Sequence, residues 1–318
     1  MTDLPASVEI REEGPREGFQ IEPGPIATDR KVALVDALSA TGLHHIQVCS
    51  FVSPKLVPGW ADAEAVVAGF APKAGVTYTA LWFNAAGLNR ALAFRDRLKV
   101  EGAVTVVASE AFSLKNLNRD RAKNLAAQRT NVAAHLEAGV AVPRISVQAA
   151  FGCNYSGDVP PAKVIEALAD AFAIGAEQGL ALTEATLADT MGWATPARIE
   201  RVIGEVRSRW PELSIILHLH DTRGLGIANA HAGLRLGISR FDTTVGGLGG
   251  CPFAGQPGAP GNIATEELAL LCEEMGIATG IDLDALVDAG RLAEEVVGRR
   301  LPSTLLRSGG LAHFRKAA

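Results

Sequence analysis

Residues 214–220 read Ser214-Ile215-Ile216-Leu217-His218-Leu219-His220, a short apolar run that ends in two histidines and is followed by Asp221. A run of this length and composition predicts a buried strand. Helices are expected on both sides of it, over 196–210 and 228–236. A buried strand between two helices is the unit of a parallel sheet, because parallel strands need a crossover that is usually helical.

The same order of strand and helix extends along most of the chain. Strands are predicted at 8–11, 45–50, 77–83, 104–109, 145–150, 182–188 and 240–245, and further helices at 28–40, 61–69, 89–97, 120–138, 161–179 and 265–274. Eight such units favour an α/β fold, a (β/α)8 TIM barrel, over an open doubly wound sheet. We expect one barrel domain over 1–318, with extra C-terminal helices over about 280–318 that begin with a helix pair over 282–300.

Composition narrows the classes of protein that this chain can represent. Hydrophobic residues make up 48% and charged residues 20%, with a net charge of −5, as expected for a globular protein with a large core. No basic run predicts nucleic-acid binding, and no apolar stretch reaches the roughly 18 residues of a membrane span. The four cysteines form no CxxC pair. We expect a cytoplasmic protein with no nucleic-acid or membrane partner and, by default, a homodimer.

The histidines stand where the strand over 214–220 ends. In a TIM barrel the chemistry lies at the carboxyl ends of the strands. His218 and His220 are two residues apart, so their side chains point to the same side of the strand. Two imidazoles with carboxylate or amide oxygens suit a borderline divalent cation. The alternative is a pair of hydrogen-bonded core histidines.

Other strand ends carry further candidates. Arg16 and Glu17 are expected in a turn after the first strand, where a solvated salt bridge is the plain alternative. Asn262 precedes the last barrel helix, where an N-cap or turn role is common. Cys251 lies in a glycine-rich loop and is a candidate for proton transfer, although most lone cysteines are small apolar residues. Asp189 follows the strand over 182–188.

Five segments, taken in order, resemble the 3-hydroxy-3-methylglutaryl-CoA lyase family. They are 14–20 (GPREGFQ), 50–55 (SFVSPK), 218–222 (HLHDT), 246–252 (GGLGGCP) and 261–266 (GNIATE). The resemblance covers about Val8 to about Leu283, within a superfamily of metal-dependent barrels that also holds isopropylmalate and homocitrate synthases. It implies a lyase that cleaves a 3-hydroxyacyl-CoA by retro-Claisen chemistry, with 3-hydroxy-3-methylglutaryl-CoA giving acetyl-CoA and acetoacetate.

The resemblance also implies roles for single residues. The metal ligands would be Glu17, His218, His220 and Asn262, and the metal would be Mg or Mn, or else Co or Zn. Arg16 would bind the thioester oxygen and stabilise the enolate, Cys251 would take part in proton transfer, and Asp189 would lie near the reacting hydroxyl. Gln20, Gln47 and Ser50 are expected to bind substrate, and Lys55 and Lys115 are candidates for contact with CoA.

Two positions depart from the lyases of this family. The lyases carry Arg-Asp where this chain has Arg16-Glu17, and a glutamate where it has Gln47. Homocitrate synthases look similar with Arg-Glu-Gly, which makes a glutamate ligand compatible with the superfamily. The departures leave room for another substrate, such as citramalyl-CoA or a longer branched 3-hydroxyacyl-CoA. They also leave room for a synthase that runs the condensation and for a non-catalytic barrel that binds metal or ligand.

Overall fold

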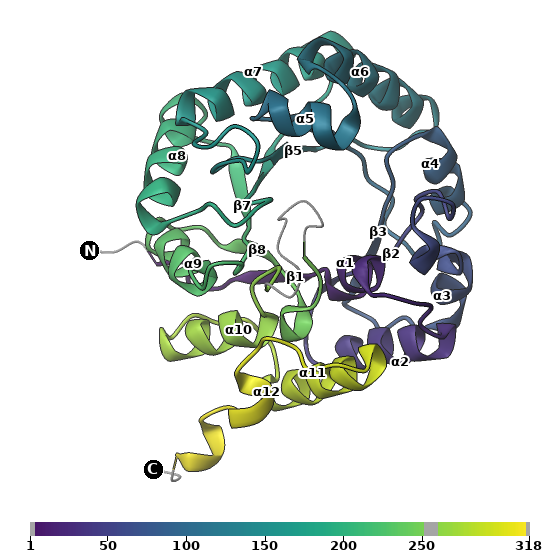
Figure 1. Cartoon of the computed structure of the whole chain (residues 1–318), viewed down its shortest axis with the longest axis vertical. Helices are drawn as coiled ribbons and strands as arrows, with labels where there is room; N and C mark the ends of the chain where they lie inside the picture. Colours follow the sequence, from purple (N-terminus) through teal and green to yellow (C-terminus); the bar gives the residue numbers. More distant parts are fainter. Residues whose placement is uncertain (1–3, 251–259, 316–318) are drawn as a thin grey trace.

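The computed structural model of the chain describes residues 4–250 and 260–315. Eight parallel strands form one sheet in the order β3-β2-β1-β8-β7-β6-β5-β4, and Figure 1 shows them curled into a ring inside a ring of helices. The strands are β1 (Glu9–Glu12), β2 (His45–Ser50), β3 (Thr77–Leu81), β4 (Ala103–Val107), β5 (Arg144–Gln148), β6 (Glu184–Ala188), β7 (Ser214–His218) and β8 (Arg240–Thr243). The predicted (β/α)8 fold is confirmed.

The helices between the strands cover the outside of the ring. They are α2 (Thr28–Ser39), α3 (Ala63–Gly69), α4 (Ala85–Leu92), α6 (Arg121–Glu137), α7 (Pro161–Gln178), α8 (Pro196–Arg209), α9 (Gly226–Arg235) and α10 (Thr265–Glu274). Shorter helices are α1 (Gly14–Ile21), η1 (Pro58–Trp60), α5 (Glu110–Leu117) and η2 (Val245–Gly247), and α11 (Leu283–Val297), α12 (Leu305–Ser308) and η4 (Ala312–Phe314) follow the barrel. None of the helices in the described part of the chain is long and apolar enough to cross a membrane.

The inside of the barrel is more polar than is usual for this fold. In β4 and β5 the fully buried residues are aliphatic, such as Val104 and Ile145, and they belong to the hydrophobic core. The residues between them, Thr105, Ser146 and Gln148, line a cavity in the barrel. TIM barrels commonly fill this space with branched apolar side chains. Here the space is left for polar groups and for a ligand.

The ring of strands has a seam between β3 and β4. These two strands stand at the ends of the strand order, and no ladder joins them among the described residues. Side chains of α6 take the place of a neighbouring strand: Thr105 N donates to Gln128 Oε1 at 2.9 Å, and Asn124 Nδ2 donates to Thr105 O at 3.2 Å. The edge of β4 is thus hydrogen-bonded without a strand partner.

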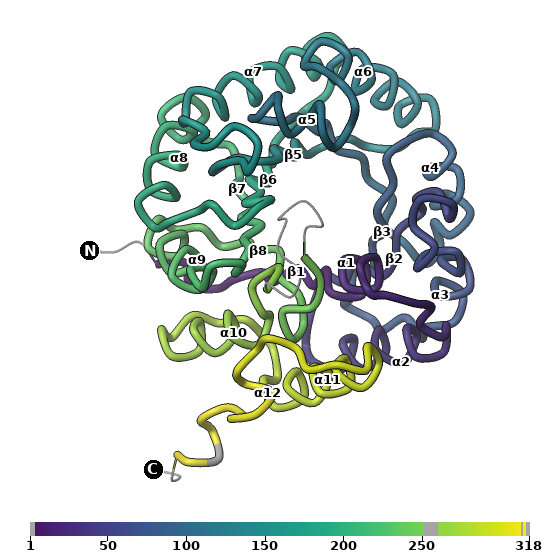
Figure 2. Tube along the Cα trace, viewed as in Figure 1, coloured from purple at the N-terminus to yellow at the C-terminus, as the bar shows by residue number. Residues whose placement is uncertain are grey.

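The first and last strands of the barrel close the opposite side of the ring. β1 pairs with β8 along its whole length, from Glu9 opposite Arg240 to Glu12 opposite Thr243. Figure 2 shows β1 between β2 and β8, so the start of the chain lies beside residues more than 200 positions later. The carboxyl end of β1 therefore meets those of β7 and β8.

Two predictions about short segments are wrong. Arg16 and Glu17 lie in the helix α1, where a turn was expected, because Pro15 stands in the first turn, a position that a helix accepts without loss of a hydrogen bond. The expected helix pair over 282–300 is the single helix α11, which Asp282 caps by accepting from Ala285 N at 3.0 Å. It ends at Gly298, whose φ of 70° suits glycine. Figure 1 shows α11 beside α2.

Candidate metal and active site

The candidate site lies in a cavity of about 630 Å³ inside the barrel. Six predicted site residues line it, and they come from α1, β2 and the end of β7: Arg16, Glu17, Gln20, Gln47, His218 and His220. Glu13 and Asp242, which the sequence analysis did not single out, line it as well. Both histidines therefore face a cavity, in contrast to a pair enclosed in an apolar core.

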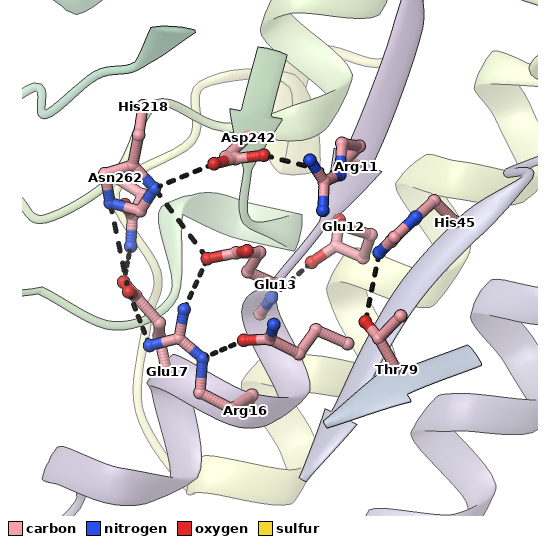
Figure 3. A network of polar contacts seen from close by, with 12 residues as sticks. Arg11, Glu12, Glu13, Arg16, Glu17, His45, Thr79, His218, Asp242 and Asn262 are labelled. Carbon is pink, nitrogen blue, oxygen red and sulfur yellow. Dashed lines mark hydrogen bonds and ion pairs between the residues drawn. The ribbon is translucent and has the colours of Figure 1, made fainter. Parts of the chain in front are cut away.

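Three of these side chains converge closely enough to hold one metal ion. One ligand atom each of Glu17, His218 and His220 lies within 4.8 Å of the others. The backbone of His220 bridges to that of Asn262, which brings the Asn262 side chain to the same place. There Asn262 Nδ2 donates a hydrogen bond to Glu17 Oε2, as Figure 3 shows. The four predicted ligands thus lie together.

The unpaired atoms in this cluster are of the kind that a divalent cation binds. Asn262 Oδ1 and His220 Nδ1 are buried and have no hydrogen-bond partner among the described residues. Buried polar atoms normally have a partner, because leaving one unpaired costs free energy. A carboxylate, imidazole nitrogens and an amide oxygen form a donor set that suits a borderline divalent ion. The residues present therefore fit a metal site.

The electrostatics of the cluster favour a charged carboxylate next to a neutral imidazole. Burial raises the pKa of Glu17, but Arg16 and the two histidines outweigh it and lower this pKa to about 2. Burial, with the neighbouring His218, lowers the pKa of His220 to about 4. Burial lowers the pKa of His218 too, but Asp242, Glu17 and Glu13 raise it to about 9. A metal ligand must be neutral imidazole, so cation binding here is coupled to loss of the His218 proton.

Arg16 lies beside the cluster with part of its hydrogen-bonding capacity free. Its Nη1 donates to Glu17 Oε1 at 2.7 Å, its Nη2 to Glu13 Oε2 and its Nε to Gln47 Oε1. Figure 3 shows the guanidinium between the carboxylates of Glu13 and Glu17. A guanidinium has five N–H donors, and these contacts use three of them. Within residues 4–250 and 260–315, only these three donations of the guanidinium are seen.

Asp242 and Arg11 support His218 from inside the barrel. Asp242 Oδ2 lies 3.5 Å from His218 Nδ1, and Arg11 Nε lies 3.7 Å from Asp242 Oδ1. Burial raises the pKa of Asp242, but Arg11 and His218 outweigh it and keep this carboxyl ionised. A carboxylate on the second ring nitrogen fixes the orientation of a ligating histidine. Both residues lie in short strands that carry other charged residues, Glu9–Glu12 and Arg240–Thr243, so the sequence does not mark these two in particular.

One carboxylate oxygen of Asp189 is held by the backbone and the other, Oδ2, is buried with no hydrogen-bond partner among the described residues, so its predicted role near the reacting hydroxyl stays a prediction. It is buried, and its Oδ1 accepts hydrogen bonds from Trp193 N at 2.6 Å and Ala194 N at 3.0 Å. It is not among the residues that line the cavity. Burial raises its pKa to about 6. The contacts of Asp189 organise the loop after β6.

The rest of the predicted site residues are distributed as follows. Gln20 lines the cavity, and its Oε1 has no partner among the described residues. Ser50 is buried at the end of β2 but does not line the cavity. Lys55 and Lys115 are exposed. Cys251 lies outside the described residues.

Comparisons with known proteins match this chain to hydroxymethylglutaryl-CoA lyases. Residues 7–293 match the family model described as HMGL-like. A hydroxymethylglutaryl-CoA lyase of Bacillus subtilis is 40% identical over 311 residues, which cover 95% of this chain and 97% of the relative. A 3-hydroxy-3-isohexenylglutaryl-CoA/hydroxymethylglutaryl-CoA lyase of Pseudomonas aeruginosa is 41% identical over 297 residues, 93% of this chain and 95% of that one.

A comparison with solved structures also finds an HMG-CoA lyase. A solved structure of an HMG-CoA lyase from Acinetobacter baumannii, in complex with coenzyme A and 3-methylmalate, is similar with a TM-score of 0.85 and 36% identity. The match covers 98% of each chain. The similarity therefore extends through the barrel and the helices that follow it.

Proposed function

This chain belongs to the HMGL-like family, and on that premise we propose that it is a divalent-metal-dependent carbon–carbon lyase that cleaves 3-hydroxy-3-methylglutaryl-CoA to acetyl-CoA and acetoacetate. One observation carries the proposal beyond family membership. Glu17, His218 and His220 line one cavity beside the guanidinium of Arg16, and Asn262 contacts Glu17 there. The first group would bind a cation, and Arg16 beside it would bind an oxyanion.

The reaction divides between these two parts of the cavity. Glu17, His218, His220 and Asn262 would hold the metal, which when bound polarises the oxygens of the substrate and orients them. Arg16 binds the thioester oxygen through its remaining N–H donors. A fixed cation at the place where negative charge develops lowers the activation barrier more than a solvated one, because it needs no reorganisation.

The proposed reaction breaks one carbon–carbon bond and moves two protons. The 3-hydroxyl loses its proton, C3 becomes a ketone carbon, and the bond between C2 and C3 breaks with its electrons on the acetyl-CoA enolate. A proton then adds to C2. Asp189 and His220 are our two candidate bases for the hydroxyl proton: His220 lines the cavity, and Asp189 Oδ2 is buried with no hydrogen-bond partner among the described residues. Cys251 is the proposed source of the proton for C2.

Two cavity residues bear on which 3-hydroxyacyl-CoA is preferred. Glu17 and Gln47 both contact Arg16. The relative from Pseudomonas aeruginosa carries a longer, branched substrate in its name. Citramalyl-CoA or a longer branched 3-hydroxyacyl-CoA is therefore the second candidate substrate.

Release of acetyl-CoA from a panel of CoA esters tests the proposal. We expect cleavage of 3-hydroxy-3-methylglutaryl-CoA, its loss with EDTA, and its recovery with Mg²⁺ or Mn²⁺. Arg16→Met should lower kcat by roughly a hundredfold or more while bound metal stays near the wild-type level. Near-normal turnover in Arg16→Met would remove Arg16 from the mechanism, and a wild-type protein that binds metal but cleaves no ester would favour a non-catalytic barrel.

Two further parts of the proposal need separate measurements. Mg²⁺ or Mn²⁺ as the physiological ion is tested by metal analysis of protein purified without added metal. A homodimer in the cytoplasm is the proposed assembly and location. Sedimentation equilibrium decides the assembly, and fractionation of the source cells decides the location.

A further inference from the structure

Glu13 is a carboxylate in the cavity that the proposed reaction does not use. It directly precedes α1, and only 6% of its surface is exposed. Its Oε2 accepts a hydrogen bond from Arg16 Nη2 and lies 3.7 Å from His218 Nδ1. Figure 3 shows it between Arg16 and His218. Glu13 therefore gives the guanidinium a second contact toward His218, beside its direct contact with Glu17.

The three groups that hold the Arg16 guanidinium differ in charge. Glu17 belongs to the cation cluster, so a bound cation takes part of its charge. Gln47 is a neutral amide. Glu13 is then the carboxylate of the three that lies outside the group of Glu17, His218 and His220, and it faces both Arg16 and His218. Glu13 and Arg16 are three positions apart at the start of α1, a spacing that places them on the same face of the helix.

Stability gives no reason for a carboxylate at this position. Burial raises the pKa of Glu13, Asp242 and Glu17 add to the rise, and the attraction of Arg16 and His218 offsets it only in part. Burying a charge among like charges costs free energy. Charges that a fold retains against such a cost are concentrated at functional sites.

We propose that Glu13 is a positioning residue, whose carboxylate aims the Arg16 guanidinium at the thioester oxygen of the substrate in a chain whose residue 47 is an amide. The inference rests on the proposed function, which assigns that oxygen to Arg16. Gln47 contacts Arg16 Nε from the other side. A carboxylate moved from position 13 to position 47 should therefore hold the same guanidinium.

Four proteins test this: the wild type, Glu13→Gln, Gln47→Glu and the double variant with both changes. Displacement of a positioned group by about 1 Å can cost roughly a hundredfold in rate. We expect Glu13→Gln to lower kcat with 3-hydroxy-3-methylglutaryl-CoA by roughly tenfold to a hundredfold, with little change in bound Mn²⁺ or thermal midpoint. The double variant should recover at least about half of that loss on a logarithmic scale.

The affinity for acetyl-CoA and for CoA tests the role of Glu13 without catalysis. Arg16 meets the thioester oxygen, so the Mn²⁺-loaded wild type should bind acetyl-CoA more tightly than CoA in calorimetry, and Glu13→Gln should lose this difference. Glu13→Asp, which keeps the charge with a shorter reach, should lie between the two. If the wild type cleaves no CoA ester, the proposed function fails, and this binding difference still decides the role of Glu13.

Several results would overturn the role of Glu13. They are a Glu13→Gln variant with wild-type kcat, a double variant no faster than Glu13→Gln, and a binding difference that is absent in the wild type or unchanged by the substitution. Loss of Mn²⁺ in parallel with kcat would also overturn it, because Glu13 would then act on the metal cluster.

Discussion

The two ring nitrogens of His218 face different side chains and therefore have different roles. One ring nitrogen of His218 faces Glu17 at 3.9 Å, and the second faces Asp242 at 3.5 Å and Glu13 at 3.7 Å. The first side belongs to the cation cluster and the second orients the ring. Substitution of this one residue should therefore act on metal binding before it acts on chemistry.

His218→Ala is predicted to lower the affinity for Mn²⁺ by roughly tenfold or more, because it removes one ligand and leaves Asp242 without its partner. Titration of the metal-free protein with Mn²⁺, followed by electron paramagnetic resonance of the free ion, measures this. His44→Ala, at an exposed position just before β2, is the matched control and should bind Mn²⁺ as the wild type does. Stoichiometric, tight Mn²⁺ in His218→Ala would remove it from the ligand set.

Among the elements, α1 contributes most to the site. It carries Arg16 and Glu17, and Gly18 follows them directly. A Cβ atom on Gly18 would lie 2.2 Å from Leu248 Cγ, which is buried. The helix packs closely against Leu248 because residue 18 has no side chain. We infer that this contact sets the position of α1, and with it that of Arg16 and Glu17, relative to the cavity.

A pair of glycine substitutions separates packing from helix propensity. Gly204→Ala in α8, where an added Cβ meets nothing within 4 Å, should raise the free energy of unfolding by about 0.5–1 kcal/mol. Gly18→Ala gains the same propensity but should lower it by about 1–3 kcal/mol through overpacking. Urea unfolding measures both. Equal effects of the two substitutions would show that Leu248 moves aside freely.

At the scale of the whole molecule, Glu12 joins the start of the barrel to its end. Its Oε1 accepts from Val245 N at 2.9 Å and from Gly14 N, and its Oε2 accepts from Thr265 Oγ1 at 2.5 Å. Burial raises the pKa of Glu12 from its usual 4.5 to about 8, and the nearby Glu266 adds to this rise. The folded protein therefore binds a proton here that the unfolded chain has released above about pH 4.5.

The contribution of Glu12 to stability should consequently fall as the pH rises from about 4.5 to about 8, because in this window its carboxyl binds a proton in the folded protein and not in the unfolded chain. Glu12→Gln keeps the acceptor oxygen and removes the titration, so its urea midpoint should fall less steeply between about pH 5 and about pH 8. Glu266, whose pKa burial raises to about 7, leaves a residual slope in both proteins. Parallel profiles for wild type and Glu12→Gln would contradict this account.

The barrel and six of the residues that line the cavity could be predicted from the sequence, and the residues that were missed have physical reasons. The strand before His218 could be recognised from its apolar run, because burial against helices requires such residues. Glu13 and Asp242 were missed because each has a partner, His218 and Arg11 respectively, more than 200 positions away in the chain. Asp189 near the reacting hydroxyl stays a prediction, because backbone N–H groups four and five residues later hold only its Oδ1.

The seam between β3 and β4 has a consequence for the strand pairing of the barrel. Elsewhere round the ring, a wider barrel would break a ladder of backbone hydrogen bonds. At the seam, the contacts with β4 come from the amides of Asn124 and Gln128. Substitution of these two side chains would remove contacts at the edge of β4 and leave every strand pairing of the sheet in place. The seam is thus the one break in the strand ladders of the described residues, and it lies across the ring from β1, β8 and β7, which lead to Arg16, Glu17 and His218.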